Sequence, residues 1–378
     1  MHIAIFCQVV DNYGDIGVCW RLARQWMADA APDTLAVTLW VDDLVSFQRI
    51  CTKVDPLLVC QRIDGVMVRS WRDAILDDAN VVIEAFGCAL PLQVEAQMQQ
   101  VKPVWINLEY LSAEDWVESC HACASPQVSG LTRFFFFPGF TAKTGGLLAE
   151  RGLVPARDAF QQADSAAQAA WWQQLGWPQR PQALVVSLFC YPHAPLANLF
   201  DAWAQADHAV LCQVPESIAV AAIHHYFQSE GELAAGRRLS RGALTLQIIP
   251  FVDQPGYDCL LWASDLNFVR GEDSFVRAQW AARPFVWHIY PQQEETHLEK
   301  LQAFMQRYTA ALPAALVQML NRFALAWNRG EPEVLAALWP QLVLQLPLLR
   351  QHARDWAQNL AQNGNLADNL LQFIQKID

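Results

Sequence analysis

The sequence predicts an α/β protein made of two doubly wound halves, followed by a helical tail. Short apolar runs alternate with amphipathic stretches through residues 3–108, and the same alternation restarts after residue 182. Strands that alternate with helices favour a mostly parallel sheet with helices on both faces. With 378 residues, 53% of them hydrophobic, the chain is long enough to form two such cores.

In the first half, apolar residues at helical spacing from Val18 to Ala28 predict a helix between the first two strands. The segment around Phe134–Phe140 departs from the alternation and closes this half. The strands that we expect here cover residues 3–10, 36–41, 81–85 and 104–108.

Between the halves, residues 155–180 are rich in Ala, Gln and Trp and predict one helix that ends near Gly176. After Thr296 the chain reads as largely helical. In the second half we expect strands at residues 183–189, 209–213, 244–249, 266–269 and 284–288. The expected division is a first Rossmann-like domain at 1–155, a linker helix at 156–181, a second Rossmann-like domain at 182–349, and terminal helices at 350–378 that return to the first domain.

Two Rossmann-like domains that face a cleft and carry a helical C-terminal tail describe the GT-B glycosyltransferase architecture. On such sheets, ligands lie outside the carboxyl ends of the strands. The residues that follow the predicted strands are therefore the candidates for a functional site.

The charge of the chain excludes some classes of partner. Lys and Arg number 26 against 38 Asp and Glu, for a net charge of −12. Nucleic acid and anionic membranes need a basic face, so we expect neither as a partner. Met1–Cys7 lacks the basic start of a signal peptide, and the apolar runs read as too short to span a bilayer. The expected location is the cytoplasm.

The strongest candidate for a diphosphate site is the turn at residues 270–275. Here a strand runs into Gly271 and then into a helix whose first turn carries Ser274. A helix start offers unpaired N–H groups and a positive dipole end, and Arg270 adds a formal charge. Ser274 either binds the same phosphates or caps the helix. Glu272 and Asp273 either accept hydrogen bonds from sugar or ribose hydroxyls or cap backbone N–H groups.

Other residues that follow strands of the second half extend this site. Phe251 or Tyr191 would stack on a base, and Gln254 would read its edge. Tyr290 follows the next strand and would bind a phosphate, unless it packs on a helix.

In the first half, Asp11 and Asp15 flank the first strand-to-helix turn, where Gly14 and Gly17 let the backbone approach a ligand. An inverting sugar transferase needs one base on the acceptor side. Asp15 fits that role, or it caps the helix.

We find no strict Asp-x-Asp motif, and Cys120 and Cys123 lack a second pair to complete a zinc site. Charge neutralisation would come from Arg270 and the helix start. The sequence therefore predicts neither a cofactor nor a metal.

Three segments resemble the EarP family, whose members attach rhamnose to an arginine of elongation factor P (EF-P). They are residues 11–23 (DNYGDIGVCWRLA), residues 270–279 (RGEDSFVRAQ), and residues 137–140 (FPGF) with 143–146 (KTGG). The resemblance spans the whole chain.

This resemblance implies an inverting transferase that moves L-rhamnose from dTDP-β-L-rhamnose to one arginine guanidinium of EF-P and so supports translation of polyproline stretches. It assigns Asp15 as the base, with Asp11 as an adjacent essential carboxylate and Glu272 as a further catalytic candidate. The acceptor-side loop would include Asn12, Tyr13, Gly14 and Gly17. The donor-binding positions that it implies are Tyr191, Phe251, Gln254, Arg270, Glu272, Asp273, Ser274 and Tyr290.

Two alternatives stay open from the residues alone. One is a GT-B transferase whose acceptor is a small molecule, glycan or lipid. The other is a non-catalytic module that binds a protein through its acidic surface.

Overall fold

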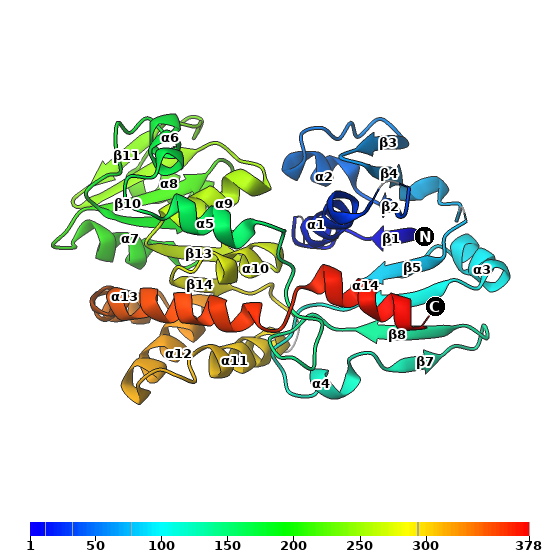
Figure 1. Cartoon of the computed structure of the whole chain (residues 1–378). Coiled ribbons are helices and arrows are strands. Elements are labelled where there is room, and N and C mark those ends of the chain that lie inside the picture. The colour runs from blue at the N-terminus through cyan, green and yellow to red at the C-terminus, as the bar shows by residue number, and fades with distance from the viewer. Residues whose placement is uncertain (12, 32, 77, 293–294, 378) are drawn as a thin grey trace. The chain divides into compact units, whose positions relative to one another are not determined.

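The structure is a computed structural model that describes residues 1–11, 13–31, 33–76, 78–292 and 295–377 (Figure 1). The chain divides into two compact units. Unit 1 comprises Met1–Arg151 and Asn359–Asp378, and unit 2 comprises Gly152–Gln358. Each unit is an α/β sandwich built on its own sheet.

Among its described residues, unit 1 contains an eight-stranded sheet, parallel except at its two edges. The first strand, β1, lies between β2 and β5, so it is buried on both faces, as its apolar sequence predicts. In spatial order the strands are β3 (Cys60–Ile63), β4 (Val66–Ser70), β2 (Ala36–Val41), β1 (His2–Cys7), β5 (Val81–Ala85), β6 (Val104–Leu108), β8 (Thr132–Phe136) and β7 (Ala124–Pro126).

The last helix of the chain, α14, belongs to unit 1 and packs beside α1. The indole of Trp26 in α1 donates a hydrogen bond to the carbonyl of Ala367 (2.9 Å), and Phe373 packs edge-on against Phe134. The helices of this unit are α1 (Gly14–Asp29), α2 (Leu44–Ile50), the short 3₁₀ turn η1 (Trp71–Asp73), α3 (Leu92–Val101), α4 (Val117–Cys120) and α14 (Leu366–Ile377).

Unit 2 contains a six-stranded sheet within the described part of the chain, with one antiparallel edge strand, β11. The strands β9, β13 and β14 are neighbours and run parallel, so their carboxyl ends share one edge of the sheet. In spatial order the strands are β11 (Arg238–Arg241), β12 (Leu244–Ile249), β10 (Val210–Pro215), β9 (Leu184–Leu188), β13 (Leu266–Arg270) and β14 (Phe285–His288).

The core of unit 2 is rich in aromatic rings. Phe268 of β13 packs on Trp203 and Trp327, and Trp203 packs on Trp339. The helices are α5 (Leu153–Phe160), α6 (Ala166–Gln174), α7 (Leu196–Ala204), α8 (Val220–Phe227), α9 (Gln254–Ala263), α10 (Asp273–Trp280), α11 (Thr296–Tyr308), α12 (Ala314–Arg329) and α13 (Pro332–Ala361).

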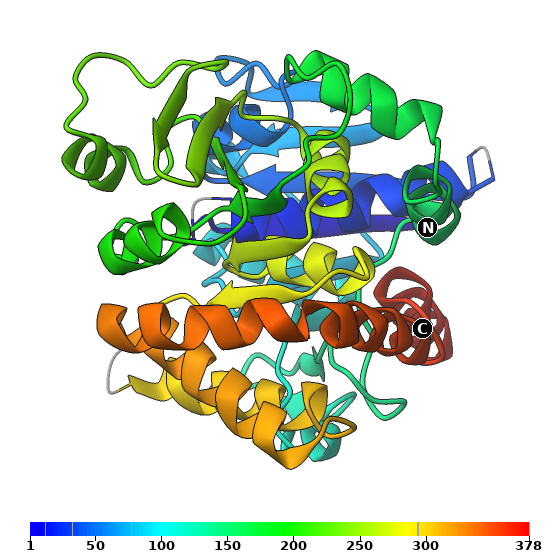
Figure 2. The same cartoon turned by 90° about the vertical axis from the view of Figure 1, so that its left-hand side faces the viewer.

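The long helix α13 lies beside β14 in Figure 1, and Figure 2 shows it along its length. In the described part of the chain it is the one helix long and apolar enough to cross a membrane by length and composition. The expectation that every apolar run is too short was therefore wrong for this segment. Its buried residues nevertheless fall on a helical stripe, which is the pattern of a helix packed on a core: Leu335, Trp339, Leu342, Leu346 and Leu349.

The central strands were predicted correctly because they are buried apolar runs. β2, β5, β6 and β12 have the predicted bounds, and β1, β9, β10, β13 and β14 differ from the predicted strands only at their ends. Of the edge strands only β14 was predicted, and the hairpin of β3 and β4 was among those missed. Its signal was the pair Asp64-Gly65, both with positive φ, which is the usual sequence of a two-residue hairpin turn.

The single helix expected at residues 155–180 was also wrong. The segment forms two helices, α5 and α6, because Asp164 takes a left-handed conformation and Ser165 caps the second helix by accepting the N–H of Gln168. Both helices pack within unit 2, where the Arg157 guanidinium donates to the carbonyl of Trp280.

Candidate functional site

The acceptor-side loop joins β1 to α1 in unit 1, and Asp15 lies at its centre. Asp15 is in the first turn of α1 and is 1% exposed. One carboxylate oxygen, Oδ2, accepts the backbone N–H groups of Val10 (2.7 Å) and Asp11 (2.9 Å). The other oxygen, Oδ1, accepts the hydroxyl of Tyr110 (3.1 Å). Three donors therefore fix the direction of this carboxylate.

The alternative role of Asp15 as a helix cap is not what the structure shows. Tyr13 occupies the N-cap position of α1, and the Asp15 carboxylate points back to the loop that precedes the helix. The loop itself is tight: Gly14 N–H donates to the Asp11 carbonyl (2.7 Å), and a Cβ on Gly14 would lie 3.2 Å from an Asp11 carboxylate oxygen. Asn12, the remaining predicted residue of this loop, lies outside the described residues.

Tyr110 is a site residue that sequence reasoning missed. It follows β6, and its ring stacks on Phe86, which follows β5 (4.4 Å between centroids, 17° between planes). Phe86 has φ of 59°, a strained conformation for a residue with a side chain. The signal was the pair Glu109-Tyr110 directly after a buried strand, at the same sheet edge as Asp15.

The donor-side residues lie at the carboxyl ends of β9, β12, β13 and β14 in unit 2. Arg270 ends β13, and its guanidinium lies over the rings of Phe189 (4.6 Å) and Tyr191 (4.9 Å). It also donates to the carbonyl of Cys190 (3.0 Å). Tyr290 packs edge-on against Tyr191 (5.8 Å) and is 41% exposed. The structure thus brings Tyr191, Arg270 and Tyr290 together.

The turn after Arg270 has the predicted form. Gly271 has φ of +66°, and α10 starts at Asp273 with Ser274 in its first turn. Ser274 is buried, and its hydroxyl donates to the carbonyl of Arg270, while its oxygen accepts the Arg270 N–H (3.1 Å). In this structure Ser274 therefore ties the end of β13 to the start of α10.

Asp273 has two side-chain partners in unit 2. Its carboxylate accepts Arg277 Nε (3.1 Å) and the amide of Gln254 (3.1 Å). Arg277 is 2% exposed and also pairs with Asp258 (2.7 Å). This buried network joins Gln254 to Asp273. Arg277 was missed, although it follows Asp273 at i+4 spacing on the same helix.

The two remaining predicted residues of unit 2 are Glu272 and Phe251. Glu272 occupies the N-cap position of α10, where it is partly buried. Within the described residues, its side chain makes no capping bond to that helix. Phe251 lies in the turn between β12 and α9 and is also partly buried.

His288 ends β14 next to Arg270 in the sheet register and is 1% exposed. Burial, followed by the neighbouring His193, Arg270 and His297, lowers the pKa of His288 to about 3. The ring is therefore neutral at pH 7.

Over the described residues, no group of three or more His, Cys, Asp or Glu side chains is arranged to hold a metal ion. Cys120 and Cys123 are not packed in a core: Cys120 is half-buried, and Cys123 is exposed. The thiol of Cys123 donates to the carbonyl of Ser119 (3.2 Å).

Comparison with known proteins gives one family. The family model for the Elongation-Factor P (EF-P) rhamnosyltransferase EarP matches residues 3–375. A protein-arginine rhamnosyltransferase of Pseudomonas aeruginosa is 48% identical over 373 residues, which cover 98% of this chain and 97% of that protein. Another, from Shewanella oneidensis, is 42% identical and covers 99% of this chain and 98% of its own length.

Solved structures agree with these relatives. The chain is similar to a protein from work on the structural basis for EarP-mediated arginine glycosylation of translation elongation factor EF-P, with 36% identity, a TM-score of 0.66 and 99% of each chain covered. A UDP-GlcNAc 2-epimerase from Neisseria meningitidis, 8% identical with a TM-score of 0.52, covers 100% of both chains and shows the shared two-domain GT-B fold alone. The chain belongs to the EarP family of EF-P rhamnosyltransferases.

Proposed function

We infer that this chain is a protein-arginine rhamnosyltransferase that transfers rhamnose to an arginine of EF-P. Family membership over residues 3–375 supports the activity and the acceptor. We propose dTDP-β-L-rhamnose as the donor and inversion at the anomeric carbon. Because EF-P acts in the cytoplasm, we place the reaction there.

The division of labour that we propose follows the two sheets. Residues 1–155, with the helices at 350–378, would bind the acceptor, and residues 182–349 would bind the donor. The segment 156–181, whose helices pack within unit 2, would connect the two along the chain. The observation that supports this best is the carboxylate of Asp15, a buried anion directed by three hydrogen bonds at a strand end.

On the donor side, Arg270 and the start of α10 would hold the diphosphate, because both are positive. Phe251 and Tyr191 would contact the base, and Gln254 would read its edge. Tyr290 would bind phosphate. Asp273 would act through the Gln254 and Arg277 network, Ser274 would keep the turn in shape, and Glu272 would accept from a sugar hydroxyl.

On the acceptor side, a guanidinium has a pKa above 12, so a carboxylate does not deprotonate it in the ground state. We propose that Asp15, with Asp11, grips the guanidinium and orients one nitrogen. As that nitrogen forms its bond to the anomeric carbon, the bond from the carbon to the diphosphate oxygen breaks. The diphosphate leaves with the electron pair, and Asp15 takes the proton.

The test is transfer to purified EF-P from dTDP-β-L-rhamnose, followed by peptide mass spectrometry. We expect a mass gain of one deoxyhexose on an arginine. Transfer to a small molecule, glycan or lipid with EF-P unmodified would contradict the assignment, and donor binding without any transfer would favour the non-catalytic module.

A further inference from the structure

Two histidines that are not among the donor-binding positions named above pack against one of them, Tyr191. His288 ends β14, and His193 follows Tyr191 in the loop after β9. Their Nε2 atoms are 3.2 Å apart. We propose that His288, with its proton placed by His193, is a positioning residue that holds the Arg270 guanidinium in place for the donor diphosphate.

The first step is the tautomer of His288. The backbone N–H of Tyr191 donates to His288 Nδ1 at 3.4 Å. A ring nitrogen that accepts carries no proton, so the proton of the neutral His288 ring is on Nε2. That N–H then donates to Nε2 of His193, and the proton of His193 is on its Nδ1. The two bonds together fix which nitrogen of each ring donates and which accepts.

The second step is the segment Phe189–Tyr191, which supports Arg270 at three places. The guanidinium lies over the ring of Phe189 and the ring of Tyr191, and it donates to the carbonyl between them, that of Cys190. The bond from Tyr191 N–H to His288 anchors the end of this segment to β14. His288 therefore controls the position of the support and, through it, the position of Arg270.

The third step is the burial of His288, which makes its hydrogen bond with the Tyr191 N–H difficult to replace. His288 is 1% exposed, packs on Trp327 (5.3 Å) and meets the ring of Tyr191 edge-on (5.1 Å). A buried backbone N–H that loses its acceptor is energetically costly. Without His288, the segment Phe189–Tyr191 would therefore shift until the Tyr191 N–H found another acceptor. His193, by contrast, is exposed, so its replacement leaves the core of the unit intact.

Three substitutions of His288 separate the two hydrogen bonds. His288→Asn keeps an acceptor near the position of Nδ1, His288→Gln keeps a polar atom near Nε2, and His288→Leu removes both. For binding of dTDP by calorimetry, we expect His288→Leu and His288→Gln to raise Kd about tenfold, the loss of roughly one hydrogen bond. His288→Asn should stay within about threefold of the wild-type Kd. The kcat of transfer should change less than about threefold in all three, because the acceptor side is untouched.

A double-substitution test distinguishes positioning from general loosening. If His288 acts through Arg270, adding His288→Leu to Arg270→Ala should raise the Kd for dTDP by less than about twofold more. Additive losses would overturn the proposal, as would an Asn variant no better than the Leu variant. His193→Ala should raise Kd about two- to threefold, since water replaces the lost ring; an unchanged Kd would contradict its part.

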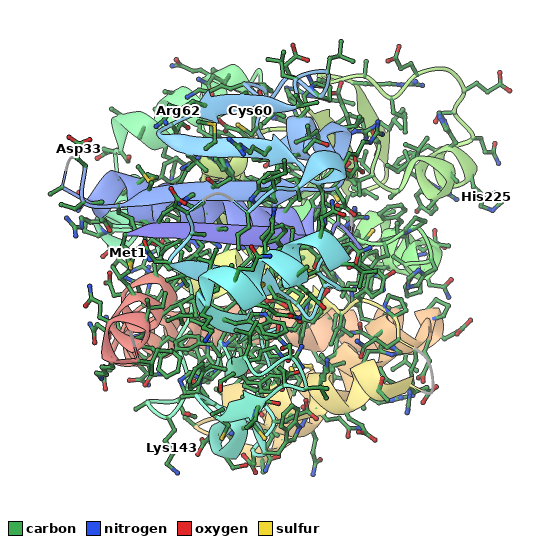
Figure 3. All side chains as sticks on the ribbon, turned by 90° about the vertical axis from the view of Figure 1, so that its right-hand side faces the viewer. Met1, Asp33, Cys60, Arg62, Lys143 and His225 are labelled. Carbon is green, nitrogen blue, oxygen red and sulfur yellow. The ribbon has the colours of Figure 1, made fainter. Side chains whose placement is uncertain are left out.

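The control is His225→Ala, an exposed histidine of α8 whose side chain points outward in Figure 3. It should leave Kd and Tm unchanged. If His288→Leu lowers Tm severely, the proposal is still tested by two other results. They are the Kd for dTDP of His288→Asn compared with that of His288→Gln, and the Kd of His193→Ala.

The proposal rests on the proposed donor site, but the two fail differently. If Arg270→Ala alone leaves dTDP binding intact, the donor site is elsewhere. If Arg270→Ala weakens binding and the histidine variants do not, only the positioning role is wrong.

Discussion

The two units hold the principal charges of the proposed reaction in different ways. The Asp15 carboxylate in unit 1 accepts three directional hydrogen bonds, two from backbone N–H groups and one from Tyr110. The Arg270 guanidinium in unit 2 lies over two aromatic rings and donates to one carbonyl. A group that takes a proton needs a fixed lone-pair direction, whereas a group that neutralises a diphosphate needs mainly charge near a given point.

The largest expected effect is on turnover and concerns Asp15. Asp15→Asn keeps the size of the side chain but removes the charge and the proton acceptor. We expect kcat to fall by about 10²- to 10⁴-fold, while the Kd for dTDP changes less than about twofold. Single-turnover transfer to EF-P and calorimetry measure the two. Asp29→Asn, at the other end of α1, is the control, and an unchanged kcat for Asp15→Asn would remove the base assignment.

The next effect is on donor affinity and concerns Arg270. Arg270→Ala should raise the Kd for dTDP by about 10- to 150-fold, because charge-assisted hydrogen bonds contribute about 1.5–3 kcal/mol. Arg241→Ala is a matched control, since that guanidinium also lies over a tyrosine ring, Tyr226, in the same unit. Donor binding equal to that of the wild type would place the diphosphate elsewhere.

The donor side contains a buried histidine, His288, and we therefore expect the stability of this unit to depend on pH. The pKa of His288 is lowered to about 3, so below the unfolded value near 6.5 the unfolded chain binds a proton that the folded chain does not. Stability from this group is complete above about pH 6.5 and is lost as the pH falls toward 3. The loss is at most about 1.4 kcal/mol per pH unit.

The measurement for that effect is the Tm of the wild type and of His288→Asn between pH 7 and pH 5. Between pH 7 and pH 5.5, the Tm of the wild type should fall by a few degrees more than the Tm of His288→Asn. This difference is what about 1.4 kcal/mol produces in a unit of this size. Parallel Tm curves would mean that His288 takes up a proton in the folded protein.

A smaller effect concerns Tyr110. Tyr110→Phe keeps the ring on Phe86 but removes the hydroxyl that binds Asp15. We expect kcat to fall about fivefold, near the contribution of one hydrogen bond of about 1 kcal/mol, without a change in donor Kd. Tyr226→Phe, which removes the hydroxyl bound to Asp201, is the control. If only the Kd for dTDP changed, Tyr110 would act on the donor side, and its assignment to the acceptor side would be wrong.

The smallest expected effect is that of a chelator. Since Arg270 and the start of α10 are proposed to neutralise the diphosphate, transfer in excess EDTA should equal transfer without it. Loss of activity that Mg²⁺ or Mn²⁺ restores would show that a metal shares this task.

The sequence by itself determined the central strands, the position of Asp15 at the first strand-to-helix turn, the position of Ser274 in the first turn of its helix, and the family. These depend on local patterns: buried apolar runs, glycine turns and two long motifs. Edge strands such as β3 were missed because one-sided burial leaves a weak pattern.

Only the tertiary structure decided what the side chains contact. It tied Asp273 to Arg277, directed Ser274 to the backbone of Arg270, and set Tyr110 on Asp15. It also placed His288 beside Arg270 on the neighbouring strand, although the two are 18 positions apart in the sequence. The physical reason is that strands of a parallel sheet bring their carboxyl ends together whatever their spacing in the chain. Which hydrogen-bond donor meets which hydrogen-bond acceptor at the carboxyl ends of the strands depends on side-chain packing. No local sequence pattern determines that packing.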